Sequence, residues 1–172
     1  MTLIINAVLF QLGWFACVLG AAHDLPWTGA LAAVAIIGWH LAHAAQPQRE
    51  LLLVGAAAVL GALFETLLVQ TDWVRFETGV LVEGTAPYWM IALWAIFATT
   101  LNVSLQSLQS HPWLTALLGA IGGPLAYYGG ARLGALDLAA MGPALIAIGV
   151  GWAILAPLLM RIARPLNGYA RP

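Results

Sequence analysis

The chain has 172 residues, of which 62% are hydrophobic and 8% are charged, and its formal net charge is −1. Soluble domains have about a quarter of their residues charged, so this composition excludes an ordinary water-soluble protein. The six basic residues form no cluster, which excludes a nucleic-acid-binding surface. We therefore expect an all-α polytopic membrane protein, with residues 1–172 in a single domain.

Six apolar runs in chain order predict six transmembrane helices, because a span needs about 20 mainly apolar residues. The predicted spans cover residues 3–22, 28–44, 51–70, 88–108, 113–136 and 142–163. Most breaks between them are short and combine proline with polar residues, which predicts antiparallel neighbours. The longer break, residues 71–87, is expected to lie on the membrane surface, partly as an amphipathic helix and partly as an extended lid. A plain connecting loop is the alternative.

The first run, "LIINAVLFQLGWFACVLGAA", ends in small residues, as a cleavable signal peptide does. It lacks the positively charged start of such a peptide, and Trp14 and Phe15 disrupt a lipoprotein site before Cys17. A retained first helix is therefore expected. Cys17 is the only cysteine, so an internal disulfide is excluded.

The positions of arginine predict how the chain crosses the membrane. An even number of spans places both termini on one side, and four of the six arginines fall on that side. Only Arg75 and Arg132 fall on the other. Since basic residues concentrate in cytoplasmic segments, both termini are expected to face the cytoplasm.

Glu65 is the only carboxylate placed well inside a predicted span. An ionisable side chain at membrane depth is expensive and marks a functional hypothesis by default. Arg132, on the fifth span, is predicted at nearly the same depth, so a contact between the two side chains is possible if their helices are neighbours. Such a pair would either fix the register of two helices or form the polar end of a ligand site together with Tyr128.

A second polar group is expected toward the cytoplasmic side, formed by Asn6, His40, His43 and Asn102. His40 and His43 lie three residues apart and could share a metal ion. The sequence offers no carboxylate at that depth, however, and we predict no metal site. Hydrogen bonds between helices are the preferred role for these side chains, and Asn102 is the member most suited to binding a ligand.

The fifth span, which contains "GAIGGPLAYYGGARLGA", is rich in glycine. Small residues recur at every fourth position along one helical face: Gly122, Ala126, Gly130 and Gly134. Gly119 and Gly123 form a second small pair beside this Gly122 stripe. Such stripes let helix backbones approach closely in lipid, so we expect the Gly122 stripe to contact another helix, a second copy of the chain or a partner membrane protein.

Pro124 interrupts the hydrogen bonding of the same span, because it donates no backbone hydrogen bond and frees the carbonyl of Ala120. We expect a kink or an opening there, with either a pocket or a neighbouring helix covering the carbonyl. Tyr128 and Arg132 lie four residues apart on the face opposite the stripe. On that face the Arg132 side chain would either contribute to a polar site or, as the alternative, extend to the lipid headgroups.

Three segments resemble a family of small bacterial inner-membrane proteins catalogued only as a domain of unknown function. They are "NAVLFQLGWFACV" near the start, "YWMIALWAIFATTLN" over residues 88–102 and "GPLAYYGGARLGA" over residues 123–135. The resemblance implies a bacterial six-span inner-membrane protein, but no activity, cofactor or catalytic residue.

A weaker similarity, in size and span count, is to the substrate-binding subunits of energy-coupling-factor transporters. Those subunits carry a small-residue stripe on the first helix for docking their transport partner. Here Ala16 and Gly20 form only a pair on the first span, and the long stripe lies on the fifth.

These observations leave three functions open. The first is binding or transport of a small amphipathic or lipid-like molecule, with Glu65, Tyr128, Arg132 and Asn102 as ligand-binding candidates. The second is a membrane-embedded enzyme acting on a lipid or isoprenoid, in which Glu65 or a histidine transfers protons; no complete catalytic motif is present. The third is a structural or assembly subunit that docks through the Gly122 stripe. No cofactor is identified.

Overall fold

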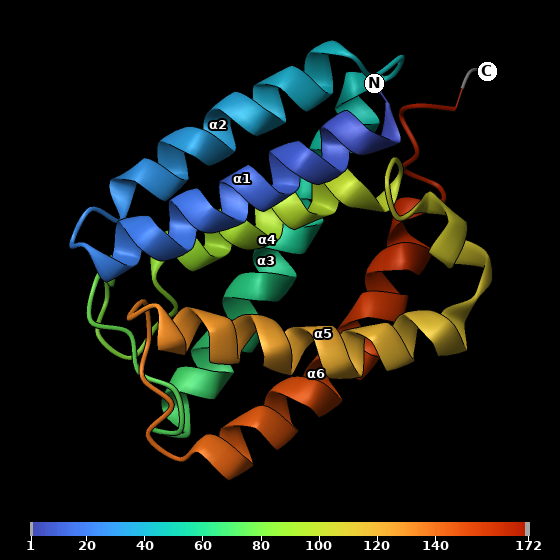
Figure 1. The fold of residues 1–172 in the computed structure, drawn as a ribbon. Coiled ribbons are helices and arrows are strands. Elements are labelled where there is room, and N and C mark those ends of the chain that lie inside the picture. Colours follow the sequence, from blue (N-terminus) through green and yellow to red (C-terminus); the bar gives the residue numbers. More distant parts are fainter. Residues whose placement is uncertain (1, 171–172) are drawn as a thin grey trace.

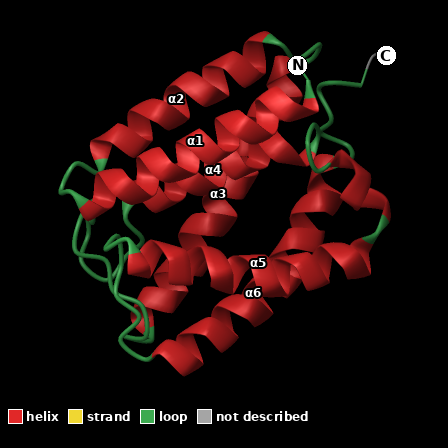
Figure 2. Cartoon of the chain, in the orientation of Figure 1, coloured by secondary structure: helices red, strands yellow, loops and turns green. Residues whose placement is uncertain are grey.

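The computed structural model describes residues 2–170, which form six α-helices and one 3-10 helix with no strand among them (Figures 1 and 2). The helices are α1 (Leu3–Ala22), α2 (Trp27–Ala42), α3 (Pro47–Gln70), α4 (Tyr88–Leu101), η1 (Gln106–Ser110), α5 (Pro112–Arg132) and α6 (Met141–Ala163). The all-α prediction is confirmed. Within this part of the chain, α1, α3 and α6 are long and apolar enough to cross a membrane, whereas α2 and α4 have only 16 and 14 residues.

Proline and small polar residues set where the helices begin. Thr2 precedes α1, and its hydroxyl accepts a hydrogen bond from the Ile5 N–H at 3.4 Å. Pro47 and Pro112 stand in the first turns of α3 and α5, where the missing N–H costs nothing and the fixed φ favours the helix. The breaks predicted from proline therefore coincide with real helix starts.

The fourth helix is shorter than the predicted span over residues 88–108. It ends at Leu101, and after a turn the chain enters η1. The Gln109 side chain donates a hydrogen bond to the Leu101 carbonyl at 2.9 Å, and the amide of Asn102 is bonded to Glu50. Gln109 thus satisfies a carbonyl at the end of α4, and Glu50 holds Asn102, so the residues after Leu101 form a cap instead of a last helical turn.

Residues 71–87 contain no helix, so the predicted amphipathic helix is wrong and the alternative of a connecting loop is correct. The loop is tied to the bundle at several points. Arg75 and Asp137 exchange two backbone hydrogen bonds of 2.9 Å, and the Thr78 hydroxyl donates to the Ala21 carbonyl at 3.1 Å. Val74 is fully buried. The loop therefore closes the end of the bundle at which α1, α3 and α5 finish.

Helix α4 lies at the centre of one half of the bundle, where it contacts α1, α2 and α3 (Figure 1). In the other half α5 packs along α6, and this hairpin meets the rest of the bundle mainly through α3, α4 and η1. Helices α1 and α5 make almost no direct backbone contact. The space between them is therefore available for a cavity.

Helices α5 and α6 approach closely at glycines other than those of the Gly122 stripe. A Cβ added at Gly119 would lie 2.5 Å from the Trp152 carbonyl oxygen of α6, and one at Gly123 would lie 2.5 Å from the Trp152 ring. Within this bundle, the helix contact predicted for the Gly122 stripe is absent at Gly122, where an added Cβ would meet no atom within 4 Å; at Gly134 it would lie 3.8 Å from the Ala22 Cβ of α1. The second small pair, Gly119 and Gly123, makes the helix contact.

Helix α5 runs through Pro124 without interruption, so the predicted opening of this helix is wrong. The carbonyl that Pro124 frees, that of Ala120, lies against α6: a Cβ added at Gly149 would be 3.2 Å from the Ala120 oxygen and 3.4 Å from the Pro124 ring. A neighbouring helix therefore covers the carbonyl, which is one of the two predicted alternatives.

Candidate functional site

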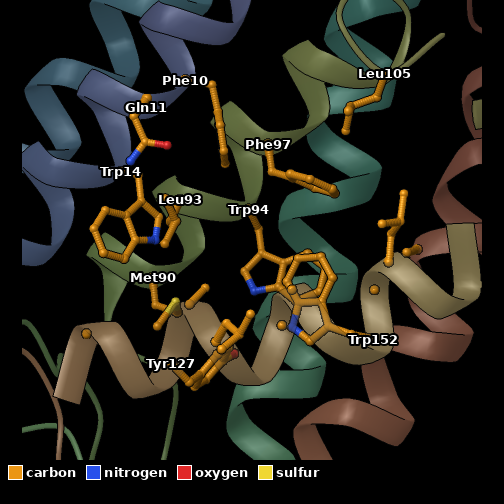
Figure 3. A pocket seen from close by; sticks show the side chains of 18 of the residues that line it. Phe10, Gln11, Trp14, Met90, Leu93, Trp94, Phe97, Leu105, Tyr127 and Trp152 are labelled. Atoms are coloured by element: carbon orange, nitrogen blue, oxygen red, sulfur yellow. The ribbon is translucent and has the colours of Figure 1, made fainter. Parts of the chain in front are cut away.

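A cavity of about 520 Å³ lies between α1, α4, α5 and α6 (Figure 3). Its volume is within the range of small-molecule sites, which are typically about 300–1,000 Å³. Aromatic rings make up much of its wall, namely those of Phe10, Trp14, Trp89, Trp94, Phe97 and Trp152. Among the described residues that line it, the polar side chains are those of Gln11, Thr115 and Tyr127, apart from the indole N–H groups, and none is charged. The cavity is therefore mostly apolar and aromatic, with few polar groups.

The cavity opens sideways between α1 and α5. Gln11 of α1 and Leu118, Gly122 and Leu125 of α5 line it and are also exposed on the outside of the bundle. Gly122 contributes no side chain, and Ala126 beside it contributes only a methyl group. The Gly122 stripe thus leaves space in the wall of the cavity, which is a different role from the predicted helix contact.

Glu65 lies directly behind the cavity wall and is fully buried. Its Oε1 accepts a hydrogen bond from Trp94 Nε1 at 2.8 Å and another from the Tyr127 hydroxyl. Both donors line the cavity, so a single layer of side chains separates Glu65 from it. Gly61, one turn earlier on α3, makes room for this arrangement, because a Cβ there would overlap the Trp94 ring.

Two polar atoms in this region have no hydrogen-bond partner among the described residues. They are Glu65 Oε2 and Trp152 Nε1, and both are buried. Trp152 stacks on Trp94 with ring centroids 4.6 Å apart, and Figure 3 shows Trp94, Trp152 and Tyr127 gathered at one side of the cavity. Since buried polar groups are normally paired, the hydrogen bonding on this side of the cavity is incomplete.

The structure does not bring the four predicted ligand-binding residues together. Glu65 is beside the cavity, but Tyr128 is 41% exposed and Arg132 is exposed, and neither lines it. Glu65 and Arg132 form no salt bridge, since the one found in the described part of the chain joins His40 to Glu50. Ligand binding by Tyr128 or Arg132 stays a prediction.

Tyr127 is the residue that the sequence analysis missed at this site. It is adjacent to Tyr128, and consecutive residues on a helix point about 100° apart, so only one of the two tyrosines faces Glu65. A signal was present in the sequence. Tyr127 lies four and eight residues after Gly123 and Gly119, and therefore on the face that these glycines turn toward the interior.

Because Tyr127 and not Tyr128 bonds Glu65, substitutions of these two tyrosines should have different effects on stability. Tyr127→Phe removes a donor from a buried carboxyl group, and we expect it to lower the free energy of unfolding by about 1–3 kcal/mol. Tyr128→Phe is the matched control and should leave stability nearly unchanged. Thermal unfolding of both variants in one mild detergent, followed by circular dichroism, measures the difference. Equal losses in the two variants would contradict the assignment.

A second buried carboxylate, Glu50, organises the polar group predicted around Asn6, His40 and Asn102. Its Oε1 accepts hydrogen bonds from Asn102 Nδ2 at 2.9 Å and from the Gly168 N–H at 2.7 Å, and its Oε2 pairs with His40 Nε2 at 2.9 Å. Glu50 is fully buried and His40 is 1% exposed. The expectation that no carboxylate lies at the depth of His40 is wrong, because α3 begins at Pro47 and includes Glu50.

The Glu50 cluster, meaning Glu50, His40, Asn102, Gly168 and Tyr169, ties the segment after α6 to α2, α3 and α4. The Tyr169 hydroxyl donates to the His40 carbonyl at 2.6 Å. Burial raises the pKa of the Tyr169 phenol, and the negative charge of Glu50 raises it further, so the phenol keeps the proton that it donates. The cluster is thus a set of hydrogen bonds between helices, as predicted for His40 and Asn102.

Asn6 has the same kind of role at this end of the bundle. Its Nδ2 donates to the Thr99 carbonyl at 3.1 Å, and its Oδ1 accepts from the Ser104 N–H at 3.2 Å.

Within the described residues, no group of three or more histidine, cysteine, aspartate or glutamate side chains could hold a metal ion.

The two buried carboxylates belong to separate sites. Glu50 and Glu65 are fifteen positions apart on α3, which corresponds to about 22 Å along the helix axis. Asn102 belongs to the Glu50 cluster and does not line the cavity. Of the two sites, only the cavity beside Glu65 offers space for a ligand, whereas the Glu50 cluster is closed by its own hydrogen bonds.

Comparison with known proteins gives one match. A family described as "Protein of unknown function (DUF2878)" matches residues 3–158, which include α1 to α5 and most of α6. No curated protein and no solved structure matches the chain. The similarity to substrate-binding subunits of energy-coupling-factor transporters receives no support from these comparisons.

Proposed function

This chain belongs to the DUF2878 family of proteins of unknown function, and we propose that it is a polytopic membrane protein that binds a small amphipathic or lipid-like molecule in the cavity between α1 and α5. The observation that carries the proposal is a laterally open, aromatic cavity with two unpaired buried polar atoms at one side: Trp152 Nε1 of a lining residue, and Glu65 Oε2 one layer behind the wall. The geometry supports binding and gives no direction of movement, so transport is not part of the proposal.

Placement in the membrane is supported by the surface of the long helices. Large apolar side chains point outward on α1, α3 and α6, including Ile4, Leu67 and Ile146, which are 76%, 66% and 69% exposed. Apolar patches of this extent normally mark a surface that something apolar covers. We propose that lipid covers it, that all six α-helices lie within the bacterial inner membrane, and that both termini face the cytoplasm, as the arginine distribution favours.

A lipid-like ligand suits the position of the opening. In the proposed orientation the gap between α1 and α5 faces the hydrocarbon, so a molecule with an apolar tail would enter from the bilayer without crossing water. Its tail would lie against the aromatic wall, and its polar end would meet the groups near Tyr127. Burial of each CH₂ group would contribute about 0.8 kcal/mol to binding.

The test is to fill the cavity without disturbing the helices. A Cβ added at Gly122 meets no atom within 4 Å, so we expect Gly122→Leu to fold normally while its side chain occupies the cavity. Native mass spectrometry of gently extracted protein should show a bound ligand on the unmodified chain and none on Gly122→Leu. Gly55→Leu is the matched control, because Gly55 on α3 is also surrounded by open space but lies away from the cavity; it should keep the ligand.

Two results would contradict the proposal. The unmodified chain could carry no added mass in any mild detergent, or Gly122→Leu could retain the same ligand as the control. The same spectra report copy number. If Gly122→Leu instead removed a second copy of the chain, the assembly role of the Gly122 stripe would replace ligand binding as the best-supported function.

A further inference from the structure

The chemistry around Glu65 indicates which class of molecule the cavity takes, an inference that rests on the proposed function. We infer that the ligand is an organic cation, an amine with an apolar tail, whose ammonium group lies among Trp94, Trp152 and Tyr127 (Figure 3). Three features support this choice: an acidic side chain bonded to the cavity wall, the balance of hydrogen-bond donors and acceptors, and the aromatic rings of the wall.

The ionisable side chain bonded to the cavity wall is an acid. Glu65 is bonded to two residues of the wall, and no arginine or histidine is among the described residues that line the cavity. Because Oε1 accepts two hydrogen bonds, it is the oxygen of a carboxylate or the unprotonated oxygen of a carboxylic acid. A carboxylate or phosphate headgroup placed here would have no basic partner and would be repelled by an ionised Glu65, whereas an ammonium group would be attracted.

The hydrogen bonds already made leave mainly acceptors for a ligand. Tyrosine and tryptophan each have a single polar hydrogen, and those of Tyr127 and Trp94 are donated to Glu65. The Tyr127 oxygen can then only accept from a ligand. Glu65 Oε2, one layer behind the wall, has no partner among the described residues and is a further acceptor when Glu65 is ionised. Trp152 Nε1 is the remaining donor on this side. An ammonium group supplies up to three donors and needs no acceptor, which fits this set.

The aromatic wall favours a cation over a neutral headgroup. Trp94 and Trp152 stack at 4.6 Å, and Phe97 meets Trp152 edge to face with centroids 5.2 Å apart. A cation over a tryptophan ring is attracted by about 0.5–2 kcal/mol, and tryptophan is the strongest of the aromatic residues in this respect. An alcohol or a carboxylate gains nothing comparable from the same rings.

The experiment compares three ligands with one tail and different headgroups. Dodecylamine, dodecanol and dodecanoate are titrated into the protein in lipid nanodiscs at neutral pH, and binding is followed by tryptophan fluorescence. Empty nanodiscs are the control for partition of each ligand into lipid. The Gly122→Leu protein is the control for fluorescence changes that do not come from binding in the cavity. We expect dodecylamine to bind at least about tenfold more tightly than the other two, which corresponds to about 1.4 kcal/mol.

Glu65→Gln supplies the second arm of the test. The substitution removes the ionisable carboxyl group while keeping a side chain of the same shape, so the affinity for dodecylamine should fall by about tenfold, toward that of dodecanol. The affinity for dodecanol should change little. If the variant does not fold, the headgroup preference of the unmodified protein still decides the question.

Failure of this inference can be distinguished from failure of the proposed function. Tighter or equal binding of dodecanol or dodecanoate by the unmodified protein, lost in Gly122→Leu, would overturn the cation and leave the binding cavity in place. An amine preference that persists unchanged in Glu65→Gln would also overturn it. If none of the three ligands binds and no co-purified mass is found, both proposals are wrong.

Discussion

Replacement of Glu50 by alanine is expected to lower the free energy of unfolding by about 3–5 kcal/mol, because it removes the acceptor at the centre of a buried hydrogen-bond network. The variant would remove the Glu50 acceptor from three buried donors: His40 Nε2, the Gly168 N–H and Asn102 Nδ2, which would keep only a longer bond of 3.4 Å to the Leu166 carbonyl. Each of these groups lies on a different element. The substitution should therefore loosen α2, the end of α4 and the segment after α6 together.

Thermal unfolding in a single mild detergent measures the loss, and Glu83→Ala is the matched control. Glu83 lies exposed in the loop over residues 71–87, where removal of a carboxylate should change stability by less than about 0.5 kcal/mol. The loss of stability in Glu50→Gln should fall between the two. The amide oxygen of glutamine still accepts hydrogen bonds, but its NH₂ group cannot accept one as a carboxylate oxygen does. A loss in Glu50→Ala no larger than that in Glu83→Ala would show that the cluster contributes nothing.

Limited proteolysis provides a second measurement of the same cluster. Gly168 and Tyr169 are bonded to Glu50 and His40, respectively. In Glu50→Ala we expect residues 164–170 to be cleaved readily at temperatures where α1 to α6 remain folded, since this segment would lose its main attachment. Cleavage at equal rates in the unmodified chain and the variant would contradict this.

The sequence predicts the helices well where local chemistry decides them. The first and sixth predicted spans, residues 3–22 and 142–163, differ from α1 and α6 by at most one residue at either end. Long apolar runs favour helix, and proline with polar residues interrupts them. The fourth span is predicted seven residues too long, because α4 is ended by hydrogen bonds from Gln109 and by the attachment of Asn102 to Glu50. Hydropathy contains no information about such distant partners.

The candidate site is predicted only in part, for a related reason. The position of Glu65 within a helix follows from its place in an apolar run, but its burial and its partners follow from how α4 and α5 are rotated about their axes. A rotation of one residue exchanges Tyr127 for Tyr128. That rotation is fixed by Gly119 and Gly123 against Trp152, and the sequence alone offers two glycine faces on α5 without stating which one meets α6.

The two glycine faces of α5 predict opposite effects for a glycine-to-alanine substitution at Gly119 and at Gly122. Gly119→Ala places a Cβ 2.5 Å from the Trp152 carbonyl oxygen. This oxygen belongs to the backbone of α6, so it cannot move aside as a side chain would, and the two helices must separate. Overpacking of this kind costs about 1–3 kcal/mol. We therefore expect a clear fall in the free energy of unfolding.

Gly122→Ala should instead stabilise the protein. Its Cβ meets no atom within 4 Å, and alanine is favoured over glycine within a helix by about 0.5–1 kcal/mol because it loses less backbone entropy on folding. Thermal unfolding of both variants under the same conditions gives the comparison, with Gly55→Ala on α3 as a further position in open space. If Gly122→Ala were the destabilised variant, the Gly122 stripe would be the one that packs against a helix. The cavity would then be filled by a neighbour, and the wall that admits a ligand between α1 and α5 would not exist.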